Sequence, residues 1–172
     1  MADPDVAVEH PNRKKASSKA TRLVVVVLLL ATAILMIVIS IGAWDVLVGA
    51  KALQLIYIGL YVLLAFFVAR WSRGVLPLIA ALAIVLFIFA LVSVPGWFER
   101  DKEGFTDPAI ASDVIGLLTA IIVPLQLLLI AFAMRGFRQA WNVEVEHAAD
   151  DDEDRPAERD DRSERGASPA PA

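Results

Sequence analysis

Acidic side chains gather in a short polar segment between two long apolar runs. Glu99, Asp101 and Glu103 occupy alternate positions, Gly104 follows, and Asp107 stands three residues after the glycine. Carboxylate oxygens at alternate positions of a polar loop are typical ligands of Ca²⁺. The spacing therefore predicts a candidate divalent-cation site formed by Glu99, Asp101, Glu103 and Asp107.

This segment resembles the first nine positions of an EF-hand calcium loop, with Glu99 at position one and Gly104 at position six. It departs from that pattern at three places. Position one is Glu instead of Asp, and Ile110 stands at position twelve, where the loop needs a bidentate glutamate. Pro95-Gly96 also interrupts the helix that would enter the loop. The resemblance implies at most a partial cation site.

Two other interpretations of the segment remain open. In the one we favour, it is a solvated turn in which Asp107 caps the next helix and Pro108 takes the first helical position. In the other, it is a docking epitope for a partner on the outer side of a membrane.

A second polar feature lies inside the last apolar run. Pro124 stands near its middle and predicts a kink, because it frees the carbonyl of Ala120. Gln126 and Thr119 add hydrogen-bonding groups. These residues could line the pocket of a small channel or transporter. We favour a structural role, in which one interhelical hydrogen bond worth about 0.6–2 kcal/mol fixes helix packing.

Residues for other chemistry are scarce. No Asp, Glu, Lys, Arg or His occurs inside the apolar runs, whereas proton-coupled carriers and pumps usually place an ionisable group there. The two histidines, His10 and His147, lie outside the runs, which disfavours haem ligation within them. The chain has no cysteine, and no serine stands in a nucleophile elbow. We therefore expect no enzymatic activity and no cofactor.

The length and composition indicate a membrane protein. The chain has 172 residues, of which 58% are hydrophobic, and its mean hydropathy is +0.62. A soluble domain has about 45–50% apolar residues. The excess is concentrated in four uncharged runs, at residues 23–43, 52–69, 75–94 and 114–134.

These runs are long enough to cross a bilayer as helices. At about 1.5 Å per residue they reach roughly 27–32 Å, close to the hydrocarbon thickness of about 30 Å. They do not alternate polar with apolar residues, as a barrel strand would. The sequence predicts an all-α membrane protein with a bundle of four transmembrane helices in residues 23–141.

Proline, glycine and tryptophan residues indicate where the helices begin and end. Pro77 fits the first turn of the third helix, and Pro95-Gly96 is expected to end it. Trp44, Trp71 and Trp141 follow the first, second and fourth runs, where interfacial tryptophans are common.

Lysine and arginine near the span ends predict the orientation. Nine of them lie on one side if there are four spans, and three lie on the other. The nine are Arg13, Lys14, Lys15, Lys19, Arg22, Arg70, Arg73, Arg135 and Arg138, and the three are Lys51, Arg100 and Lys102. Positive charge favours the cytoplasmic side, so both termini are expected there.

One alternative treats the first run as a cleaved signal peptide, which would leave three spans. We disfavour it, because the apolar region of a signal peptide has about 7–15 residues and this run has 21.

The two ends of the chain differ in charge. Residues 1–22 form a basic cytoplasmic segment, and residues 142–172 an acidic tail, both expected to be disordered. From residue 139 onward there are 11 acidic and 4 basic residues. Abundant Ala, Val, Arg and Asp favour a bacterial origin and hence a plasma membrane.

The leading functional hypothesis is a non-enzymatic structural or accessory subunit of a membrane complex. It would have the lipid bilayer and a membrane-protein partner or a second copy as its neighbours. Nucleic-acid binding is not expected, because the basic charge lies beside the membrane. The alternatives are a small channel or transporter with its pocket near Pro124, Gln126 and Thr119, and a divalent-cation sensor in the outer loop.

Overall fold

The computed structural model describes residues 6–9, 15–100, 107–139, 141 and 145–148. It divides into two compact units. One holds residues 12–142, and the other holds residues 1–11 with residues 143–172.

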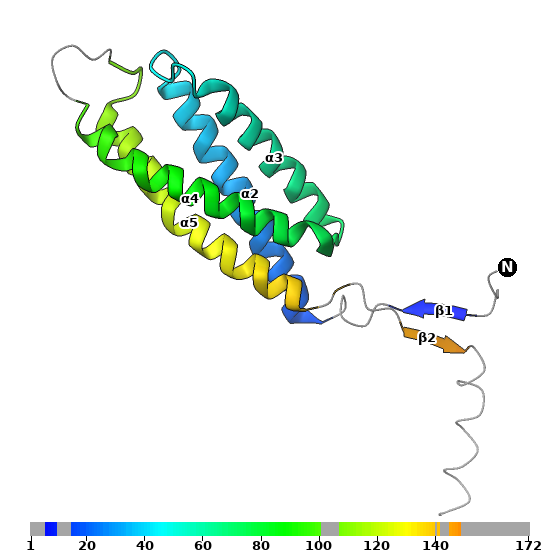
Figure 1. Ribbon diagram of the computed structural model, residues 1–172. Coiled ribbons are helices and arrows are strands. Elements are labelled where there is room, and N and C mark those ends of the chain that lie inside the picture. Colours follow the sequence, from blue (N-terminus) through cyan, green and yellow to red (C-terminus); the bar gives the residue numbers. More distant parts are fainter. Residues whose placement is uncertain (1–5, 10–14, 101–106, 140, 142–144, 149–172) are drawn as a thin grey trace, which may run out of the picture. The chain divides into compact units, whose positions relative to one another are not determined.

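The larger unit is formed by four long helices (Figure 1). They are α2 (Ala16–Gly42), α3 (Lys51–Ala69), α4 (Leu76–Phe98) and α5 (Ser112–Arg138), and a single 3₁₀ turn, η1 (Arg73–Val75), precedes α4. Each is long and apolar enough to span a membrane. The predicted helical bundle with four such helices is therefore confirmed.

Some helix boundaries differ from the prediction. α2 begins at Ala16, seven residues before the first apolar run, because its polar first turns can form backbone hydrogen bonds like the rest of the helix. α4 does not end at Pro95-Gly96 but continues to Phe98. Proline disturbs only the bond to the preceding turn, and the Pro95 carbonyl still accepts a bond from the Glu99 N–H at 3.0 Å.

The start of α5 also differs. The helix begins at Ser112, and Ala111 precedes it, so Asp107 is not its cap and Pro108 is not its first residue. The Asp113 carboxylate instead accepts a hydrogen bond from the Val114 N–H at 2.9 Å. An acidic group in the first turn is favourable at the positive end of the helix dipole.

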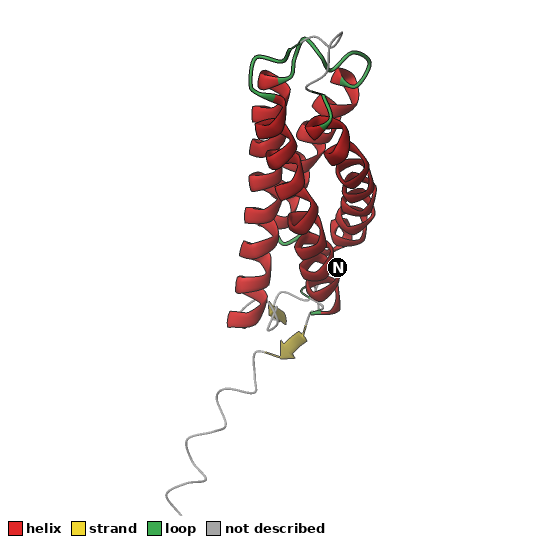
Figure 2. Ribbon diagram, turned by 90° about the vertical axis from the view of Figure 1, so that its left-hand side faces the viewer, coloured by secondary structure: helices red, strands yellow, loops and turns green. Residues whose placement is uncertain are grey.

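The helices run alongside one another (Figure 2). α4 packs along α5, and α2 packs against both α3 and α5, whereas α3 and α4 barely touch. The order across the bundle is thus α3, α2, α5, α4. α2 is the most buried of the four and α3 the least.

We call the end where α2 begins and α5 ends the proximal end, and the opposite end the distal end. The connections α2–α3 and α4–α5 both lie at the distal end (Figure 1). There the Ile110 N–H donates to the Gly42 carbonyl at 3.2 Å. Gly42 has no Cβ, and one built there would clash with the Ile110 side chain. This close approach joins the α4–α5 connection to the end of α2.

The smaller unit contains one antiparallel strand pair, β1 (Val6–Glu9) with β2 (Val145–Ala148). Val6 faces Ala148 in the register, and Glu9 faces Val145. Both strands lie in segments for which we expected no regular structure. Each contains valine, which favours extended backbone, but a pair of four-residue strands is marginal on its own.

Candidate functional site

A chain of buried polar groups crosses the middle of the bundle. The Gln126 side chain on α5 is fully buried, and its Oε1 accepts a hydrogen bond from the Tyr61 hydroxyl on α3 at 2.8 Å. Its Nε2 donates to Thr32 Oγ1 on α2 at 3.1 Å. The Thr32 hydroxyl in turn donates to the Leu28 carbonyl at 2.9 Å. Three helices are thereby linked through one amide.

This arrangement differs from a binding pocket. Tyr61, Thr32 and Gln126 are all fully buried, and both the oxygen and the nitrogen of the Gln126 amide have protein partners. Satisfied polar groups in an apolar interior fix one packing arrangement, since leaving any of them unpaired is costly. The geometry thus agrees with the packing role that we favoured for Gln126.

Sequence reasoning missed the two partners, Tyr61 and Thr32. The feature of the sequence that could have identified them is their equal distance from the connection between the two helices. Thr32 lies ten residues from the distal end of α2 (42 − 32), and Tyr61 lies ten residues from the distal start of α3 (61 − 51). Two helices joined at that end place these side chains at the same level.

The other two residues of the predicted pocket lie elsewhere. The Thr119 hydroxyl donates to the Ile115 carbonyl of its own helix at 2.8 Å, and Pro124 is exposed on the outside of α5. The structure therefore does not gather Thr119, Pro124 and Gln126 around one space.

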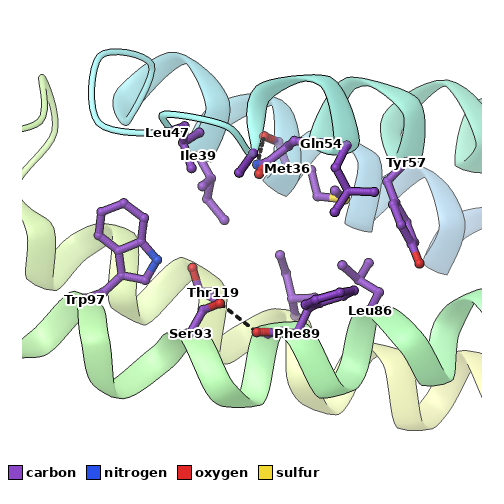
Figure 3. Close-up of a pocket in the computed structure, with 14 residues that line it drawn as sticks. Met36, Ile39, Leu47, Gln54, Tyr57, Leu86, Phe89, Ser93, Trp97 and Thr119 are labelled. Atoms are coloured by element: carbon purple, nitrogen blue, oxygen red, sulfur yellow. Dashed lines mark hydrogen bonds between the residues drawn. The ribbon is translucent and has the colours of Figure 1, made fainter.

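A cavity of about 200 Å³ lies between α3 and α4 in the distal half (Figure 3). Its lining is mostly apolar, with Met36 and Ile122 from the two central helices and Leu86 from α4. Thr119 also lines it, whereas Gln126 and Pro124 do not. The cavity exists because α3 and α4 are separated there.

Most polar groups around the cavity are already bonded within the protein. The Ser93 hydroxyl donates to the Phe89 carbonyl at 2.7 Å, and Gln54 Nε2 donates to the Met36 carbonyl at 3.3 Å (Figure 3). Two donors are exceptions, because neither the Tyr57 hydroxyl nor the Trp97 indole N–H has a hydrogen-bond partner in the described part of the chain.

The candidate cation site is only partly described. Glu99 directly follows α4, and Asp107 is an exposed residue that precedes α5. Asp101 and Glu103 lie outside the described residues. Among the residues that are described, no three His, Cys, Asp or Glu side chains come close enough to hold a metal.

Two tryptophans close the proximal end. Trp71 and Trp141 meet edge to face, with ring centroids 5.5 Å apart. Arg22 lies over the Trp71 ring at 4.3 Å and donates from Nη1 to the Ala69 carbonyl at 3.2 Å. Trp71 has a φ of 64°, an uncommon value for a bulky residue, and these contacts hold it there.

Trp141 is not at the surface as predicted. It is fully buried, with its ring against Gly136, where a Cβ would lie 3.1 Å from Trp141 Cζ2. Its Nε1 donates to Gln139 Oε1 at 3.1 Å, and Gln139 Nε2 donates to Thr21 Oγ1 at 3.1 Å. These bonds join the end of α5 to the start of α2. The sequence suggested an interfacial ring because it showed only the position of Trp141 after the last run.

No protein-family model matches the chain, and no curated protein or solved structure is similar to it at a significant level.

Proposed function

We propose that this chain is a non-enzymatic structural or accessory subunit of a membrane complex. The observation that carries the proposal is the polar chain Tyr61–Gln126–Thr32. It uses the most polar group of the bundle interior to hold three helices together. The apolar runs contain no Asp, Glu, Lys, Arg or His that could instead bind an ion or move a proton.

We further propose a plasma membrane of a bacterium as the location, with both termini in the cytoplasm. Nine basic residues flank the proximal helix ends in the sequence, against three that flank the distal ends, and this difference supports the orientation. The Thr21–Gln139 hydrogen bond supports it too, since it brings the start of α2 and the end of α5 to one end of the bundle.

The partner would be another membrane protein or a second copy of the chain, within the lipid bilayer. α3 is the least buried helix, and it has α2 as its main neighbour. Its outer face includes Gly59, beside which there is open space for a close helix contact. The acidic tail offers a second contact for a basic partner.

The two alternatives have weaker support. A transport pocket at Gln126 would need a free amide, but both ends of this amide are bonded. A cation sensor in the outer loop would lack the bidentate glutamate of a calcium loop, because Ile110 stands at that position.

Cross-linking and copurification from native membranes would test the proposal. The full-length chain should be recovered in mild detergent with one dominant membrane protein, or as a defined oligomer, at a constant ratio. A variant with Asp150 to Asp154 neutralised would measure what the tail contributes. Repeated isolation as a lone bundle, without cross-links in the membrane, would contradict the proposal.

A further inference from the structure

We propose that the cavity between α3 and α4 binds a neutral lipophilic carbonyl compound that enters from the membrane, with the Tyr57 hydroxyl donating a hydrogen bond to its carbonyl oxygen. This inference is independent of the accessory-subunit proposal, because it concerns a small-molecule site.

The size of the cavity sets the size of the ligand. The space is about 200 Å³, and an apolar cavity of about 150 Å³ can hold benzene. The enclosed part of the ligand is therefore an aromatic ring with a substituent, or a short branched segment of a longer chain.

The cavity opens sideways, toward the surface that faces lipid. Leu53 of α3 and Phe89 of α4 both line it, and yet they are 45% and 51% exposed. They therefore form the two sides of an opening between helices that barely touch. A ligand reaching this opening would come from the hydrocarbon phase.

The Tyr57 hydroxyl is the group that would recognise the carbonyl of the ligand. Its side chain is only 7% exposed, and its hydroxyl points into the space between the helices (Figure 3). This hydroxyl has no hydrogen-bond partner among the described residues, whereas the hydroxyl of Tyr61, one turn further along α3, donates to Gln126. In an apolar surrounding a hydroxyl without a partner is costly, and this one is accessible from the cavity, so the site favours a ligand that carries an acceptor.

The uncharged lining of the cavity and the depth of Tyr57 restrict the chemical class of the ligand. None of the residues lining the cavity is Asp, Glu, Lys, Arg or His, so a charged group would not be compensated. Tyr57 lies six residues from the distal start of α3 (57 − 51), which is about 9 Å along the helix. A ketone or quinone carbonyl can reach that depth, whereas the esters of a phospholipid lie nearer the headgroups.

Benzophenone is a suitable probe, because it is a neutral aromatic ketone and forms covalent adducts with nearby C–H groups on irradiation. The full-length protein in lipid nanodiscs would be irradiated over a range of benzophenone concentrations, and the adducts mapped by mass spectrometry. We expect saturable labelling at Met36, Leu53, Leu86 or Phe89.

Two variants and one control make the test specific. Tyr57→Phe removes only the donor and should weaken the apparent affinity about threefold to tenfold. Ala90→Leu puts a larger side chain at a buried position of the lining and should abolish saturable labelling. Tyr61→Phe makes the same chemical change outside the cavity and should leave labelling intact, with helicity checked by circular dichroism.

Three results would overturn the proposal. Adducts could be spread evenly over the lipid-facing residues. They could also be absent from the residues that line the cavity. Labelling could also be unchanged in either Tyr57→Phe or Ala90→Leu.

Discussion

The proximal and distal halves of the bundle have similar apolar helices but are held together differently. At the proximal end Trp141 is fully buried, and Gln139 bonds to Thr21 across two helices. In the distal half α3 and α4 separate and leave a cavity of about 200 Å³. The polar chain through Gln126 lies between these two regions.

The difference shows what determines packing in such a bundle. Lipid chains are as apolar as leucine, so burying leucine gives little net attraction between membrane helices. Close packing and interhelical hydrogen bonds must supply it. The proximal half has an aromatic pair in which Trp141 is fully buried, and several bonds between helices. The distal half relies on the Ile110–Gly42 contact and on Gln54.

Removing the Trp141 ring should have the largest effect. Trp141→Ala leaves a cavity at the proximal end and removes a hydrogen bond, so we expect the free energy of unfolding to fall by about 3 kcal/mol. Unfolding in mixed detergent micelles would measure the loss. Trp44→Ala is the matched control, because Trp44 is 45% exposed at the distal end. Equal losses in the two variants would show that the halves do not differ.

Gln126→Leu should have the next largest effect. It removes two interhelical hydrogen bonds and leaves the Tyr61 hydroxyl without its acceptor, so we expect a loss of about 1–2 kcal/mol. Gln54→Leu removes one longer bond from a partly exposed residue and should cost less. Any solute flux measured in vesicles should be unchanged by Gln126→Leu, and lost flux would instead favour the transporter interpretation.

Much of the bundle could be predicted from the sequence, because in lipid every backbone group must be bonded within the segment. A long uncharged run then has to be a helix, and all four were found at their expected places. Ends were harder to place. The start of α2 at Ala16 and the end of α4 at Phe98 depend on local hydrogen bonds, which hydropathy does not reveal.

The contacts between helices could not be predicted as well. Gln126 stands out in an apolar run, so its packing role was recognisable, but the identity of its partners depends on which helices are neighbours. Uniformly apolar spans have no polar face that would orient them. For the same reason the separation of α3 from α4, and with it the cavity beside Tyr57, had no signal in the sequence.

Two glycines at opposite ends sharpen the comparison of the halves. A Cβ at Gly136 would lie 3.1 Å from Trp141 Cζ2, and one at Gly116 would lie 3.1 Å from Trp97 Cβ. Trp141 is fully buried and cannot move aside. Near Gly116 the Phe98 ring, 3.2 Å away, is 52% exposed and can turn aside, so that only the Trp97 Cβ, which is fixed to the backbone, requires a small shift of α4. We expect Gly136→Ala to cost about 1 kcal/mol and Gly116→Ala to cost less in the same unfolding assay. The reverse order would mean that the distal half is the more rigid one.

Calcium should have the smallest effect, namely no change in melting temperature. Ile110 stands where a calcium loop needs its bidentate ligand, and it bonds and packs against Gly42 instead. Measuring the melting temperature during a calcium titration can show whether the loop binds calcium. At 10 mM calcium, even a site with a Kd of ~1 mM would stabilise the folded protein by about 1.4 kcal/mol. A shift that Asp101→Ala abolishes and Asp45→Ala does not would establish a cation site. Ligand binding, and not only the proximal contacts, would then help to stabilise the bundle.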